Sequence, residues 1–79
     1  MPTLGEFISQ AKRYGYTKHT IRIPESRAKL VYLRRGQGDR AKLVEMPYVA
    51  EHVRLGREVV FSLCAMAAIP PDDFGLADE

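Results

Sequence analysis

Two histidines and a group of basic residues are the side chains whose types and spacing could act on a phosphate backbone. A general acid or base in RNA cleavage needs an imidazole beside a cationic group and within reach of a 2′-hydroxyl. His19 lies between Lys18 and Arg22 and is the candidate for this role, whereas no residue near His52 in the sequence suggests a site. The alternative is a structural role for His19, which is commoner for a single histidine at the rim of a core.

Basic residues concentrate in the middle of the chain. Between Lys12 and Lys42 there are ten lysines and arginines against two acids, although the formal net charge of the 79 residues is only +2. This distribution favours binding of a polyanion such as RNA, or of an acidic partner. The alternative is a solvated sheet face whose lysines and arginines protect edge strands. The residues expected to contact phosphate are Arg22, Lys29, Arg34, Arg35, Arg40 and Lys42.

No cofactor and no metal site is expected. The single cysteine, Cys64, cannot form an intrachain disulfide, and no spacing of cysteine and histidine suggests zinc. The glycine-rich turn 36–39 is too short for a phosphate-cradling motif, and no dinucleotide fingerprint is present. The pair Asp72-Asp73 follows two prolines, which favours a polar cap over a metal site.

The chain is expected to be a single domain spanning residues 1–79 and to be cytoplasmic. Its first residues lack the basic start and apolar run of a signal peptide. The longest apolar run, within 54–74, begins with charged residues and has too few unbroken apolar residues to span a bilayer.

Two stretches have the apolar periodicity of a helix. Thr3 and Glu6 have the spacing of a capping box, and a helix is predicted over 4–14, ending before Gly15. A second helix is predicted to end before Pro70-Pro71. Its expected buried stripe comprises Leu55, Val59, Val60, Leu63, Met66 and Ala67. Phe61 falls on the opposite, polar side, and is either a partner contact or a tolerated exposed apolar residue.

Three strands are predicted between these helices, over 17–23, 28–34 and 40–46. Tight turns between them indicate an antiparallel meander. The predicted fold class is α+β, an α-β-β-β-α two-layer sandwich whose three-stranded antiparallel sheet has both helices on one face. If Ile21 points at the helices, Lys18, Thr20 and Arg22 lie on the other face, open to water or a ligand.

The chain resembles HicA-type mRNA interferase toxins of bacterial toxin–antitoxin pairs. The similar stretches are L-G-E-F-I-S-Q-A-K-R-Y-G-Y (4–16), K-L-V-Y-L-R-R-G-Q-G-D-R-A-K-L-V-E-M-P (29–47) and R-E-V-V-F-S-L-C-A-M-A-A-I-P-P-D-D-F (57–74). The resemblance implies a fold like that of double-stranded-RNA-binding domains, action on RNA, and an antitoxin-like protein partner.

The likeness departs from the family at the catalytic motif. HicA toxins carry Gly-Ser-His at the start of the second strand, and the matching residues here are Arg27-Ala28-Lys29. Lys29 in place of the histidine would be a poor general base, because an unperturbed lysine has a pKa of about 10.4. Three hypotheses follow: a diverged nuclease that uses His19, a non-catalytic nucleic-acid binder, or a protein-interaction module that forms a homodimer or binds an acidic partner through Phe61 and the strand edges.

Overall fold

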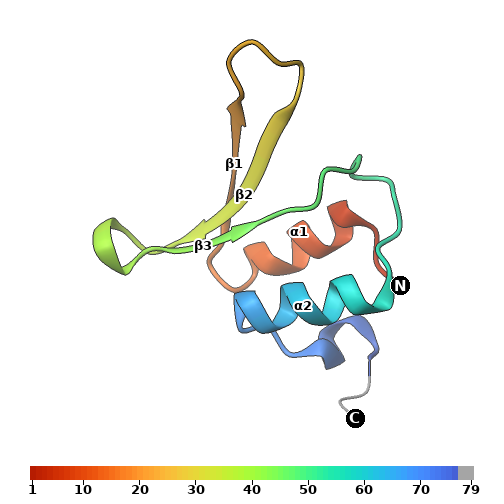
Figure 1. The fold of residues 1–79 in the computed structure, drawn as a ribbon. Coiled ribbons are helices and arrows are strands. Elements are labelled where there is room, and N and C mark those ends of the chain that lie inside the picture. Colours follow the sequence, from red (N-terminus) through yellow and green to blue (C-terminus); the bar gives the residue numbers. More distant parts are fainter. Residues whose placement is uncertain (77–79) are drawn as a thin grey trace.

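The computed structural model describes residues 1–76 and has the predicted α+β architecture (Figure 1). The elements are α1 (Leu4–Lys12), β1 (Thr17–Arg22), β2 (Lys29–Arg35), η1 (Gly38–Arg40), β3 (Lys42–Glu45), α2 (Arg57–Ala67) and η2 (Pro71–Phe74). The strands form one antiparallel sheet in the order β1-β2-β3. Both helices pack on one of its faces, which confirms the predicted layout. Over residues 1–76, no helix is long and apolar enough to cross a membrane.

The start of α1 is fixed by its capping box. The Glu6 N–H donates to the Thr3 hydroxyl at 3.1 Å, and the Thr3 N–H donates to the Glu6 carboxylate at 2.8 Å. The hydrogen bond that the Glu6 carboxylate accepts from the Thr3 N–H is the main cause that lowers the pKa of Glu6. The helix buries Leu4, Phe7, Ile8 and Ala11, as their spacing predicts.

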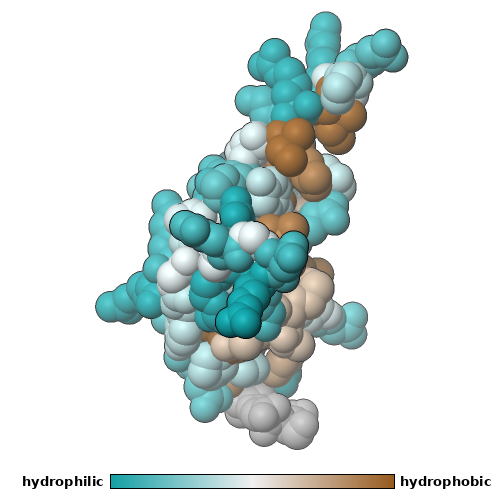
Figure 2. Space-filling view, turned by 90° about the vertical axis from the view of Figure 1, so that its left-hand side faces the viewer, coloured by the Kyte–Doolittle hydropathy of each residue, from teal (hydrophilic) through white to brown (hydrophobic). Residues whose placement is uncertain are grey.

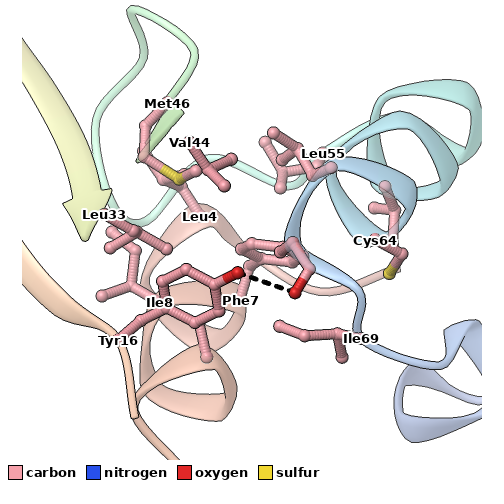
Figure 3. Close-up of a cluster of buried hydrophobic side chains, with 14 of the residues drawn as sticks. Leu4, Phe7, Ile8, Tyr16, Leu33, Val44, Met46, Leu55, Cys64 and Ile69 are labelled. Atoms are coloured by element: carbon pink, nitrogen blue, oxygen red, sulfur yellow. Dashed lines mark hydrogen bonds between the residues drawn. The ribbon is translucent and has the colours of Figure 1, made fainter. Parts of the chain in front are cut away.

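The core lies between the two helices and the part of the sheet that they cover (Figure 3). The sheet contributes Leu33 and Val44, with Met46 just beyond β3, and all three are buried. Tyr16 is also buried, and its hydroxyl donates to the Ala67 carbonyl at 2.8 Å, drawn as the dashed line in Figure 3. This hydrogen bond joins the start of β1 to the end of α2.

The register reverses the predicted assignment of the sheet faces. Residues directly opposite in an antiparallel pair share a face. Lys18 is opposite Leu33, which is buried against the helices, so Lys18, Thr20 and Arg22 belong to the helix-facing side. The prediction that these three residues lie on the uncovered face is therefore wrong. Ile21, which was expected to point at the helices, lies on the uncovered face instead and is 48% exposed.

The reversal has a physical cause in the position of β1. The hairpin of β1 and β2 extends beyond the helices, so much of β1 contributes nothing to the core (Figure 1). Its alternation of β-branched residues therefore does not mark a buried face. In Figure 2, hydrophilic side chains cover the tip of this hairpin and hydrophobic ones gather just below it.

The buried side of α2 also differs from the predicted stripe. Val60, Leu63, Cys64 and Ala67 are buried. Val59 and Met66 are 40% and 49% exposed, so their predicted place in the core is wrong. Phe61 is half-buried against the core rather than opposite it, and the Arg57 guanidinium lies 5.3 Å from its ring centroid. The C-terminal segment also packs on α2 through η2, and it adds Phe74 and Leu76 to the core.

Candidate nucleic-acid interface

The uncovered side of the sheet carries a stacked pair of rings. We call this side the open face; its residues are Thr17, His19, Ile21, Leu30, Tyr32, Arg34, Leu43 and Glu45. His19 and Tyr32 are direct cross-strand partners, and their rings stack with centroids 5.1 Å apart and an interplanar angle of 16°. Aromatic rings and aliphatic side chains on an uncovered sheet offer a platform on which nucleobases can stack.

A hollow of about 540 Å³ lies at one end of the open face. It is lined by Gly15, Thr17, His19, Arg34, Gly36, Gln37 and Gly38, and we call it the His19–Arg34 hollow. The start of β1 and the end of β2 meet there because Thr17 is opposite Arg34. Gly15 and Gly36 have φ of 90° and 89°, which lets the chain turn sharply at both strand ends.

Hydrogen bonds fix the orientation of the His19 ring. The Thr17 Oγ1 lies 2.8 Å from His19 Nε2 and 3.3 Å from the Arg34 carbonyl oxygen. The carbonyl can only accept, so the hydroxyl proton belongs to that bond and Nε2 donates to Oγ1; the tautomer is assigned from this network. In the neutral ring Nδ1 then carries the lone pair, and it has no hydrogen-bond partner within residues 1–76.

Arg34 supplies the positive charge of the hollow. It is half-buried, and its guanidinium makes no ion pair within the part of the chain that the structure describes. A guanidinium has five N–H donors in a planar fork that matches a phosphate group. The hollow therefore combines a guanidinium without an ion pair with an imidazole whose second nitrogen has no hydrogen-bond partner within residues 1–76.

Two of the residues predicted to contact phosphate interact with other parts of the fold or are half-buried in it. Arg35 lies with its guanidinium 4.8 Å from the Tyr16 ring centroid and donates to the Tyr14 carbonyl at 3.3 Å. Lys42 is opposite Arg35, half-buried on the helix-facing side. Arg35 therefore stabilises the start of β1 rather than offering its charge to a ligand.

The other basic residues are spread over the molecule. Arg22 and Lys29 are exposed opposite each other near the hairpin tip, on the helix-facing side, and Arg40 is exposed in η1. Of the six residues, only Arg34 lies on the open face. The six residues therefore do not form one basic surface, because the register places four of them on the helix-facing side and Arg34 on the open face.

The sequence contained a signal for Tyr32 that the prediction did not use. A turn over 24–27 is centred between Glu25 and Ser26, and a hairpin with that centre pairs His19 with Tyr32, as observed. The turn 36–38 also lines the hollow, which the short length of the turn does not predict.

A larger hollow of about 860 Å³ beside α1 is a weaker candidate. Its lining includes Glu6, Glu51 and Asp73. Each carboxylate already has a partner: Thr3 for Glu6, Lys18 for Glu51, and Tyr14 with Gln10 for Asp73. Contact with Lys18 lowers the pKa of Glu51. Residues 1–76 place no group of three or more His, Cys, Asp or Glu side chains to hold a metal ion.

Comparisons of the chain with protein-family models, with curated proteins and with solved structures give no match. The function is therefore inferred from the site itself.

Proposed function

We propose that the protein binds RNA on its open face, in keeping with its resemblance to HicA-type toxins. The observation that supports this most is the His19–Arg34 hollow, which joins a guanidinium and an imidazole beside the half-buried stack of His19 and Tyr32. Arg34 contacts a phosphate, and the Tyr32 side of the face receives a base. Phosphate contact gives affinity, and base contact adds selectivity.

The spacing of the side chains on the open face suits a single, unpaired strand of RNA. Arg34, Tyr32 and Leu30 alternate along β2, so successive side chains on this face are roughly 6.6 Å apart. Apolar side chains of Ile21, Leu30, Tyr32 and Leu43 line a hollow of about 400 Å³ next to the stack, with the Glu45 carboxylate at its rim. A duplex buries its bases, so single-stranded RNA is the form that this surface fits.

The test compares two arginines on opposite faces. Arg34→Gln is expected to weaken binding of a labelled single-stranded RNA at least about tenfold, and to reduce the salt slope by roughly 0.7 for one phosphate. Arg22→Gln removes the same charge from the helix-facing side and is expected to change affinity less than about threefold. Equal losses in both variants, or no binding by the wild type at about 50 mM salt, would contradict the proposal.

RNA cleavage is a second candidate, favoured by the place of His19 in the same hollow. Its free Nδ1 can take a proton from a 2′-hydroxyl, whose oxygen bonds to phosphorus while Arg34 stabilises the phosphate. The bond from phosphorus to the 5′-oxygen breaks, and the departing oxygen takes a proton from water. We expect the wild-type protein to cleave RNA and to halt growth on expression, and His19→Ala to abolish both while RNA binding persists. An antitoxin-like partner would restore growth. Normal growth and intact RNA with the wild type would leave binding as the function.

A further inference from the structure

The outer edge of β3 has unpaired main-chain groups. The Met46 N–H donates to the Val31 carbonyl at 2.9 Å, and hydrogen-bonded positions alternate along an antiparallel strand. The N–H and C=O groups of Leu43 and Glu45 therefore point away from β2. Ala41 cannot extend this edge, because its N–H donates to the Gly38 carbonyl at 3.1 Å.

Apolar side chains surround the same edge. Leu43 and Tyr48 are 62% and 66% exposed, and the exposed Val59 and Met66 of α2 line a groove of about 590 Å³ beside β3. An edge strand of this kind invites pairing with another strand. The edge of β1 differs, because its outward positions are Lys18, Thr20 and Arg22.

We propose that β3 pairs antiparallel with β3 of a second copy of this chain, giving a two-fold homodimer with one continuous sheet. With a two-fold axis normal to the sheet, the helix-facing side of one copy continues into the helix-facing side of the other. Residues that pair across the interface must therefore lie on the same face. Leu43 then lies opposite the second copy's Glu45, and the two equivalent pairs form four main-chain hydrogen bonds. The dyad passes between the two Val44 residues.

Charge complementarity supports a second copy as the occupant. The same register puts Lys42 opposite the second copy's Met46, on the helix-facing side. Met46 and Glu58 line one groove, so the lysine of each copy reaches the Glu58 carboxylate of the other. Neither Lys42 nor Glu58 forms an ion pair within residues 1–76 of its own chain. The dimer also brings the exposed Val59 and Met66 of each α2 toward those of the other.

A charge-swap experiment tests the register. The mass of RNA-free protein is measured by sedimentation equilibrium over a range of concentrations. Lys42→Glu and Glu58→Lys are each expected to raise the dimer dissociation constant at least about tenfold, and the double variant to restore it to within about threefold. Arg22→Glu, a reversal on the same face of the opposite edge strand β1, is expected to leave it unchanged. A wild type that stays monomeric, or a dimer insensitive to both reversals, would overturn the proposal.

Amide hydrogen exchange gives a second readout that does not depend on variants. The amides of Leu43 and Glu45 are expected to exchange fast in dilute protein and at least about tenfold more slowly in concentrated protein, since dimer formation pairs them. The outward amides of Lys18, Thr20 and Arg22 in β1 serve as the internal control and should stay fast. Protection of the β1 amides, or none at β3, would show that the sheet does not extend through β3.

Discussion

Tyr16, the residue before β1, is hydrogen-bonded to both helices, through its N–H to the Ala11 carbonyl of α1 and through its hydroxyl to α2. Its ring lies in the core, and its hydroxyl donates to the carbonyl of Ala67 at the end of α2. Tyr16→Phe keeps the ring and leaves a buried carbonyl without its donor, so we expect the free energy of unfolding to fall by about 1 kcal/mol. Urea unfolding measures this change in the free energy of unfolding.

Tyr48→Phe is the matched control. The Tyr48 side chain is exposed, and its hydroxyl lies 3.3 Å from a Glu45 carboxylate oxygen at the surface. Its loss is expected to change the free energy of unfolding by less than about 0.5 kcal/mol. Equal effects of the two substitutions would mean that the hydroxyl of Tyr16 contributes no more to the free energy of unfolding than an exposed hydroxyl does.

Asp73 should make folding stability depend on pH on the acid side. Hydrogen bonds from the Tyr14 hydroxyl, and from Gln10 Nε2 at 3.0 Å, lower the pKa of its carboxyl, and the same contact raises the pKa of Tyr14. A lowered folded-state pKa adds stability above the unfolded value of about 3.9, and that stability is lost as pH falls through the folded value.

We therefore expect Asp73→Asn to flatten the decline of the thermal midpoint between about pH 5 and pH 2. The group is exposed, so the effect is small. Asp72→Asn, which alters the neighbouring carboxylate outside these hydrogen bonds, should keep the wild-type profile. A profile for Asp73→Asn that coincides with the wild type would refute the contribution of this carboxylate.

At the scale of elements, the sequence predicted the secondary structure of each segment better than the face that each segment buries. The capping box at Thr3 and the Pro70-Pro71 break located both helices, because these signals are local. The faces of β1 depend on where the helices end relative to the hairpin, which no residue in β1 encodes. The buried side of α2 likewise depends on how the helix packs against the rest of the core, which its own periodicity does not specify.

The assignment of faces predicts different costs for two aliphatic truncations. Leu33→Ala removes a fully buried side chain from the centre of β2 and is expected to lower the free energy of unfolding by about 2–5 kcal/mol. Ile21→Ala acts on a side chain that is half exposed, and its expected cost is below about 1 kcal/mol. Chemical denaturation distinguishes them, and a larger loss at Ile21 would restore the face assignment predicted from the sequence.

At the scale of the whole molecule, the order of elements was enough to predict the α+β layout. The candidate site was only partly predictable. His19 and Arg34 were both identified, but as members of different groups, since their meeting depends on the pairing of β1 with β2. The count of basic residues overstated the binding surface, because charge along a chain does not specify charge on a face.

The central claim is that the open face contacts RNA, and mapping chemical shifts during titration with a short single-stranded RNA tests it most directly. We predict that the largest changes occur at Thr17, His19, Tyr32 and Arg34, with Arg22 and Lys29 little affected. Changes concentrated on the helix-facing side of the sheet, or none at saturating RNA, would contradict the account.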